Sequence, residues 1–179
     1  KLIKRVENKF AGKNLKCTLS HIGDNAFLAS DCDILAPCAV GAILNPQTIP
    51  QIKAKIICGA ANNQLEDPQR DGLALKERGV SYVPDFLTNR MGIVNCADEQ
   101  SGYVANDPLY ERHLEHNWEH SVFQVTKRVF EVAEKSDQTP GDVALGLAEE
   151  LSFVNHPIMG HRGQQIINTI VNEKWFAKE

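Results

Sequence analysis

The sequence lacks the features that would place the chain on nucleic acid or in a membrane. Its 179 residues carry a net charge of −4, and its one basic cluster, residues 1–5, is short. Nucleic-acid phosphates are bound by clustered lysine and arginine, so no nucleic-acid partner is expected. The longest uncharged run, residues 34–52, contains Pro37, Pro46 and Pro50, which argues against a membrane span there.

Paired cysteines and a leader segment are also missing. The five cysteines are odd in number, widely spaced and without a C-x-x-C motif, so we expect free thiols and a cytoplasmic location. No apolar segment follows the basic residues at the start, so no signal peptide is expected. The chain begins with Lys1 instead of methionine, which is expected of a processed protein or of a fragment.

The first half of the chain alternates short apolar runs with turn residues, a pattern typical of buried strands. The predicted strands lie within residues 33–37, 55–59 and 81–84. Between the last two, Asp67 and Pro68 are expected to begin a helix that Gly79 ends. Such alternation indicates an α/β fold with a parallel sheet, and the continuously apolar strands predict burial of both sheet faces, in three layers.

The second half has the periodicity of helices. One apolar stripe at spacings of three and four comprises Leu114, Trp118, Val122, Val125, Val129 and Val132. It predicts a single helix of about seven turns that begins at Asp107 and Pro108. Thr139 is expected to cap a second helix, and a third is predicted from Ile166 to Trp175.

Small and amide side chains follow each predicted strand, within residues 37–41, 59–64 and 84–92. Open parallel sheets bind ligands at the carboxyl ends of their strands, and amides both donate and accept hydrogen bonds. Glycine, asparagine and proline also dominate ordinary turns. Ligand binding and plain turn chemistry therefore both remain open on these residues alone.

Three other features have a functional and a structural interpretation. His116 and His120 could bind a metal from one helix face, although the glutamates between them favour a solvated face. The basic segment 156–162 could contact a phosphate, but a connection between helices is the favoured interpretation. Cys38 could be a nucleophile, but it has no recognisable histidine partner, which favours a small apolar role.

Three motifs in order resemble the Glu/Leu/Phe/Val (amino acid) dehydrogenase family. They lie at residues 33–65, 77–86 and 92–99, and the resemblance covers about residues 31–103. It implies a Rossmann-like parallel sheet, later strands only, with long C-terminal helices: a partial dinucleotide-binding domain over 1–105 and a helical region over 106–179. It also implies NAD or NADP as cofactor, oxidative deamination of an L-amino acid to a 2-oxo acid, and a homo-oligomer.

The resemblance assigns roles to seven residues. Cys38 and Ala39 would lie beside the nicotinamide half of the cofactor. Two asparagines would contact the nicotinamide ribose and the bound amino acid, a third would lie near the site, and two residues would line the substrate side-chain pocket. The two asparagines in contact with the ribose and the amino acid are Asn62 and Asn63, and the third is Asn89. The two pocket residues are Ile93 and Cys96.

The chain departs from the family where Arg90 and Met91 replace alanine and glycine after Asn89. Arg90 could pair with a substrate carboxylate or an acidic side chain. Alternatively, it could face solvent or pair with Asp85 or Asp98. Because Ile93 and Cys96 offer neither a charge nor a strong donor, we expect an apolar substrate and a peripheral Arg90.

Two parts of a complete dehydrogenase have no counterpart. No G-x-G-x-x-G motif occurs, and neither does the acidic residue that would read the adenosine ribose. The substrate domain, whose two lysines and aspartate carry the family's chemistry, is absent too. The resemblance thus implies part of a dehydrogenase, not active alone. The alternative is a truncated, non-catalytic relative that serves as a nucleotide-binding or oligomerisation module.

Overall fold

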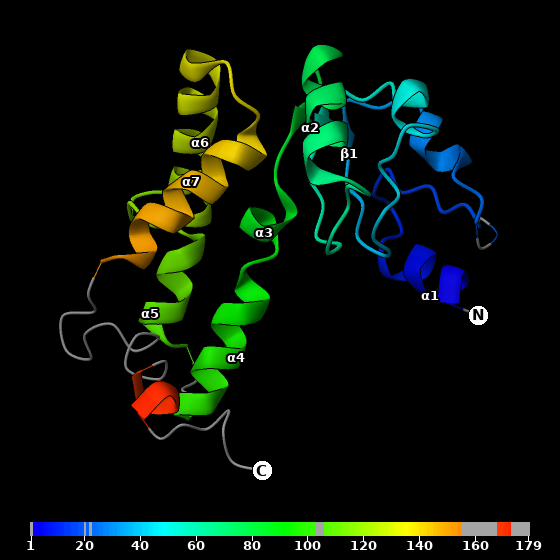
Figure 1. The fold of residues 1–179 in the computed structure, drawn as a ribbon. Coiled ribbons are helices and arrows are strands. Elements are labelled where there is room, and N and C mark those ends of the chain that lie inside the picture. The colour runs from blue at the N-terminus through cyan, green and yellow to red at the C-terminus, as the bar shows by residue number, and fades with distance from the viewer. Residues whose placement is uncertain (1, 20, 22, 103–105, 155–167, 173–179) are drawn as a thin grey trace, which may run out of the picture.

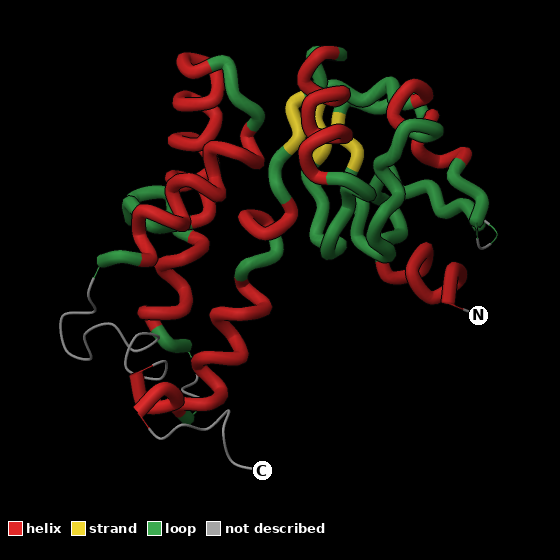
Figure 2. Tube along the Cα trace, viewed as in Figure 1, coloured by secondary structure: helices red, strands yellow, loops and turns green. Residues whose placement is uncertain are grey.

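The computed structural model of the chain describes residues 2–19, 21, 23–102, 106–154 and 168–172. A small sheet and α2 lie beside a group of helices that α3 and α4 connect to the sheet (Figure 1). Strands occupy little of the chain, and most of the rest is helix and loop (Figure 2). The α-helices and strands are α1 (Leu2–Lys9), β1 (Ile34–Leu35), β2 (Ile56–Ile57), α2 (Pro68–Glu77), β3 (Ser81–Tyr82), α3 (Asp85–Thr88), α4 (Met91–Ser101), α5 (Pro108–Glu111), α6 (Val122–Ser136) and α7 (Pro140–Ser152).

The three strands form a parallel sheet in the order β1-β2-β3. All three lie inside the predicted segments, so the α/β prediction is confirmed. In this register Leu35, Ile57 and Tyr82 are neighbours across the sheet. All three are buried in a core to which Leu75 of α2 also belongs. The crossover through α2 therefore both connects β2 with β3 and covers one face of the sheet.

The expected burial of both sheet faces is wrong for the described residues. Ile34 and Ile56 begin β1 and β2 and are 58% and 38% exposed. Successive residues of a strand point to opposite faces, so these two side chains lie on the face opposite Leu35 and Ile57. A parallel sheet buries both faces only when other elements cover both. Here the core lies on one face, and the three-layer arrangement is not present.

The start of α2 follows the sequence prediction. The Asp67 carboxylate accepts hydrogen bonds from the backbone nitrogens of Gln69 and Arg70, at 3.0 and 2.9 Å. Pro68 is the first helical residue, and Gly79 follows the helix with a φ of +70°, a conformation that costs glycine little. These local preferences explain why α2 begins and ends where the sequence indicates.

The long helix predicted through Leu114 and Val132 is broken in the structure. Residues 112–114 form a 3₁₀ turn, Leu114 is 60% exposed, and α6 begins only at Val122. Ser121 is fully buried and its hydroxyl accepts a hydrogen bond from the backbone nitrogen of Gln124 at 3.1 Å. A serine in this role starts a helix, so the apolar spacing continued across a helix boundary.

The two long helices α6 and α7 pack on α3. Their core contains Leu87, Val129, Ala133, Val143 and Ala144. As predicted, Thr139 caps α7: its hydroxyl accepts a hydrogen bond from the backbone nitrogen of Asp142 at 3.2 Å.

The last predicted helix is described only in part, because residues 168–172 are helical and Ile166 and Trp175 lie outside the described residues. The basic segment 156–162 also lies outside them. Among the helices that the structure describes, none is both long and apolar enough to span a bilayer.

The buried carboxylate of Asp71 generates a prediction about acid stability. It accepts hydrogen bonds from the Arg70 side chain and, at 2.8 Å, from the backbone nitrogen of Asp67. Burial opposes its ionisation, but these bonds outweigh burial and hold the pKa of Asp71 below 3.8. Asp71→Asn should therefore lower the free energy of unfolding at neutral pH by about 1.5–3 kcal/mol, as for hydrogen bonds to charged groups.

The contribution of Asp71 has a definite pH dependence. A carboxylate whose pKa is lowered in the folded state stabilises the fold above its unfolded pKa and loses that effect as the pH falls through the folded value. Urea unfolding at neutral pH and at about pH 3 should therefore show a smaller acid loss for Asp71→Asn than for the unchanged protein. Glu77→Gln, an exposed acid on the same helix, is the control. Equal acid loss in all three proteins would contradict the assignment.

Candidate functional site

The loops after the three strands meet at one edge of the sheet. The backbone nitrogen of Ala61 donates to the carbonyl of Pro37 at 3.0 Å, and that of Ala42 donates to the carbonyl of Asn63 at 2.7 Å. The segment after β3 joins them through Asn89. Because parallel strands direct their carboxyl ends to the same edge, residues far apart in the sequence come together here.

Asn62 and Asn89 form the side-chain contact at this edge. Asn89 Nδ2 donates to Asn62 Oδ1 at 2.6 Å. The bond uses the acceptor of one amide and a donor of the other. Nδ2 of Asn62 and Oδ1 of Asn89 make no hydrogen bond with any described residue. The pair therefore presents one donor group and one acceptor that a ligand could use.

Asn63 is held by its backbone and by Asp85. Its φ of +51° is in the left-handed region, which asparagine tolerates better than most residues. Its backbone nitrogen donates to Asp85 Oδ2 at 2.6 Å. Gly41 packs so closely against this turn that a Cβ there would lie 2.7 Å from the carbonyl oxygen of Asn62. The Asn62–Asn63 turn is thus fixed from two sides while both side chains are exposed.

Asp85 was not among the residues expected in the site. It begins α3, after Val83 and Pro84 have followed β3, and so lies beyond the carboxyl end of a parallel strand, where such sheets present ligand-binding groups; that position was the available signal. The Tyr82 hydroxyl lies 3.5 Å from Asp85 Oδ1. Burial first, and then the charge of Asp85, raises the pKa of Tyr82, so the phenol stays protonated at neutral pH.

Gln64 is a second residue that the sequence analysis missed. It is fully buried, and its Nε2 donates to the carbonyls of Gly59 and Ala61 at 2.8 and 3.0 Å. Thr88 Oγ1 also donates to the Gly59 carbonyl, at 2.6 Å. These bonds satisfy the backbone of the turn after β2 from inside the protein. Because Gln64 follows two other amide residues, Asn62 and Asn63, the sequence does not show whether its side chain is buried and bonded to the backbone or exposed to solvent.

Cys38 and Ala39 lie in the loop after β1 and are both exposed. Burial first, and then Cys38, raises the pKa of the Cys58 thiol. The Pro37–Ala61 backbone contact brings this loop to the edge that carries the asparagines. The structure therefore groups the loop of Cys38 and Ala39 with the asparagine turn.

Ile93 and Cys96 lie on α4. Ile93 is 77% exposed and Cys96 is also exposed. The described residues do not enclose them with the asparagines.

Arg90 is directed toward the helices. Its Nη2 donates to the His120 carbonyl and lies 3.5 Å from His113 Nδ1. Burial lowers the pKa of Arg90, and no described ion pair joins it to Asp85.

The expected helical spacing of His116 and His120 is not present, because both residues precede α6. The His116 ring stacks on Phe123 with centroids 4.3 Å apart, and His120 contacts Trp118 edge to face. Within the described ranges, no three side chains of the metal-binding types are grouped as a metal site would require. The metal interpretation of this segment therefore has no structural support.

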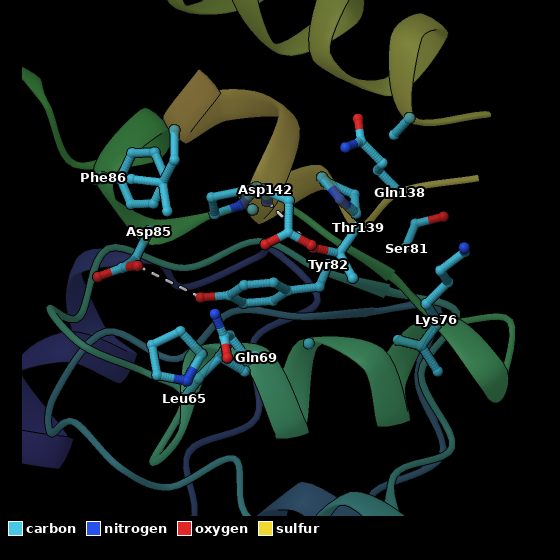
Figure 3. A pocket seen from close by; sticks show the side chains of 18 of the residues that line it. Leu65, Gln69, Lys76, Ser81, Tyr82, Asp85, Phe86, Gln138, Thr139 and Asp142 are labelled. Carbon is cyan, nitrogen blue, oxygen red and sulfur yellow. Dashed lines mark hydrogen bonds between the residues drawn. The ribbon is translucent and has the colours of Figure 1, made fainter. Parts of the chain in front are cut away.

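A cavity of about 1000 Å³ adjoins the site between α2, β3 and the α6–α7 connection. Tyr82 lies along it and points toward Asp85, with Thr139 and Asp142 on another wall (Figure 3). We call the edge of the sheet where Asn62, Asn63 and Asn89 meet the asparagine edge. Asn63 and its partner Asp85 belong both to this edge and to the lining of the cavity. Lys76 Nζ contacts Asp137 Oδ1 at 2.6 Å, which ties α2 to the α6–α7 connection.

The chain is similar to known amino-acid dehydrogenases. The chain is 42% identical over 130 residues to leucine dehydrogenase of Geobacillus stearothermophilus, covering 72% of this chain and 33% of that protein. It is 39% identical over 120 residues to L-tryptophan dehydrogenase of Nostoc punctiforme, covering 67% and 32%. The crystal structure of L-tryptophan dehydrogenase from Nostoc punctiforme superposes with a TM-score of 0.63 at 37% identity, covering 70% of this chain and 36% of that one.

The match covers only part of these relatives. The chain spans about a third of the length of the curated relatives it matches. A family model described as Glutamate/Leucine/Phenylalanine/Valine dehydrogenase matches residues 1–153, which is most of the chain. The chain therefore belongs to the Glutamate/Leucine/Phenylalanine/Valine dehydrogenase family.

Proposed function

We propose that the chain forms part of an NAD(P)-dependent amino-acid dehydrogenase that converts an L-amino acid into a 2-oxo acid. The observation that carries this proposal is the asparagine edge: Asn62 bonded to Asn89, and Asn63 held by Asp85, at the carboxyl ends of parallel strands. The family membership and the relatives named as dehydrogenases of leucine and tryptophan support it. Because the chain spans only about a third of the length of those relatives, the activity is proposed for a complete enzyme.

The residues at this edge fit the nicotinamide half of a dinucleotide. Asn62 Nδ2 and Asn89 Oδ1 make no hydrogen bond with described residues, and a carboxamide and ribose hydroxyls need both donors and acceptors. Cys38 and Ala39 are small and exposed in the adjoining loop, which leaves room for a planar ring beside them. When bound, the nicotinamide supplies the hydride acceptor, which no amino-acid side chain can provide.

The contribution of this chain is to position the reactants. Asp85 fixes the backbone of Asn63, so the Asn63 side chain starts from a defined place next to Asn62. Rigid placement of this kind converts binding energy into correct alignment of the reacting atoms. We assign Asn62 and Asn63 to the cofactor ribose, and Asn63 and Asn89 to the amino acid. Ile93 and Cys96 would enclose an apolar substrate side chain once the rest of the enzyme covers α4.

Residues 1–105 would then be part of the dinucleotide-binding domain, with 106–179 as a helical region packed on it. The packing of α6 and α7 on Leu87 of α3 supports this division. The alternative is a non-catalytic relative that binds nucleotide or oligomerises through its helices. Its distinguishing feature would be a coding sequence without an upstream glycine-rich fingerprint and lysine-containing domain. Finding both upstream would support the enzyme.

The role of Asn63 can be tested in the complete enzyme. Asn63→Ala should lower kcat/KM by about 10²-fold, because the amide that aligns the reactants is lost. Steady-state kinetics with the amino acid and cofactor varied separately would measure the change.

The positive φ of Asn63 calls for two controls. Asn63→Gly removes the amide but accepts the left-handed backbone, so it should lose as much activity as Asn63→Ala. Asn106→Ala alters an asparagine with a similar φ of +57° outside the asparagine edge and should leave kcat/KM unchanged. Recovery of activity in Asn63→Gly would show that backbone strain, and not the amide, explains the loss.

The position of Arg90 predicts substrate preference. Its guanidinium is bonded to the His120 carbonyl, so Arg90 is not placed to bind an acidic substrate side chain beside the asparagines. The complete enzyme should prefer leucine and other apolar amino acids over glutamate. In Arg90→Ala the ratio of the two kcat/KM values should not change, and this ratio is independent of the amount of folded enzyme. A preference for glutamate that Arg90→Ala abolishes would contradict this prediction.

A further inference from the structure

A second cavity, of about 340 Å³, lies among α3, α4, α6 and α7. None of Asn62, Asn63 and Asn89 lines this cavity, and the proposed dehydrogenase reaction assigns it no role. Its volume is within the range of sites that hold small molecules. It shares the α3–α4 turn with the asparagine edge, because Arg90 lines the cavity and directly follows Asn89.

The polar groups that line this cavity are all basic. They are Arg90, His113, His120 and Arg128, and no aspartate or glutamate is among the lining residues. Burial first, and then the charges of Arg90, Arg112 and His120, lowers the pKa of His113. The one described carboxylate paired with this group is Glu119, 3.6 Å from His120 Nε2, and its side chain is 78% exposed. The positive charge of the two arginines is therefore not neutralised from within the described part of the cavity.

The two arginines also have unused donors. Nε of Arg90 and Nε of Arg128 are buried, and neither has a hydrogen-bond acceptor among the described residues. Arg128 takes part in no described ion pair either. A buried donor without an acceptor costs free energy, and a guanidinium matches a carboxylate through two parallel hydrogen bonds. A carboxylate in this cavity would supply both the negative charge and the acceptors that these two donors lack.

The remaining walls select the rest of the ligand. They are formed mainly by aliphatic side chains, among them Leu87, Val125, Val129 and Leu147. A small hydrophilic anion would leave this apolar surface in contact with water, whereas an alkyl chain would cover it. The cavity thus combines basic groups suited to a carboxylate with apolar walls suited to a hydrocarbon.

We propose that this cavity binds an organic monocarboxylate with an apolar tail, whose carboxylate is held by Arg90 and Arg128. The proposal is independent of the proposed dehydrogenase activity, because it concerns binding at a site that contains none of the residues assigned to that reaction.

Calorimetric titration of the intact protein with octanoate tests the proposal. Octanoate should bind saturably, and Arg128→Gln should weaken the binding at least about tenfold, as expected when a hydrogen bond to a charged group is lost. Arg128 is chosen because Arg90 also holds the His120 carbonyl, so changing Arg90 would disturb the fold. The control is Lys127→Gln, which removes the same charge from the neighbouring, 59% exposed residue of α6 and should leave binding unchanged.

Further titrations distinguish the contribution of the carboxylate from that of the alkyl chain, and binding in the cavity from binding at the protein surface. Acetate and inorganic phosphate carry the charge without the tail, octanol carries the tail without the charge, and each should bind more weakly than octanoate. Ala148→Trp places a large ring at an exposed position of the cavity lining and should block octanoate while circular dichroism stays unchanged. Absent octanoate binding, equal binding by the two charge variants, or equal binding of acetate and octanoate would overturn the proposal.

Discussion

The contact between Gly59 and Pro37 is the constraint on which the site depends. A Cβ on residue 59 would lie 2.1 Å from the carbonyl oxygen of Pro37, closer than any side chain permits, so β2 can end against the loop after β1 only because residue 59 is glycine. The same residue's carbonyl accepts hydrogen bonds from Gln64 and Thr88. One backbone unit therefore joins the segments after β1, β2 and β3. The asparagine edge is a consequence of that junction, since Asn62 and Asn89 approach each other only when the segments after β2 and β3 are held together.

The short helix α3 extends this order from the sheet into the helical half. At its start, Asp85 bonds to the backbone of Asn63, and at its end Thr88 bonds to Gly59. Leu87 faces the other way, into the core formed with Val129 of α6. Directly after α3, Arg90 bonds to the carbonyl before α6. Asp85 and Thr88 thus bond to the turn after β2, whereas Leu87 and Arg90 contact the helical half.

Sequence reasoning succeeded where the physical cause is local and failed where it is not. The Asp67 cap and the Thr139 cap each depend on residues within one helical turn, and both were confirmed. The strands at 33–37, 55–59 and 81–84 were also confirmed, because each is marked locally by an apolar run that ends at a glycine or proline. The break before α6 was missed because the apolar spacing is the same on both sides of it. Only the burial of Ser121 and the ring contacts of residues 113–123 distinguish a boundary from a continuous helix. The exposed side of Ile34 and Ile56 was missed because a strand's sequence does not say whether anything covers its second face.

The site residues also divide into those that the sequence predicted and those that it did not, and Arg90 belongs partly to each group. The three asparagines were expected from their place after the strands and from the family resemblance, and the structure brings them to one edge. Asp85 and Gln64 were missed because they hold the turn by long-range or buried contacts, and a sequence shows neither. The position of Arg90 beside Asn89 suggested a role toward the substrate. A guanidinium on a long side chain can reach either side of a tight turn, and here the His120 carbonyl and the cavity below it lie within reach on the helical side. Adjacency in sequence placed Arg90 at the right turn, and packing decided which site it serves.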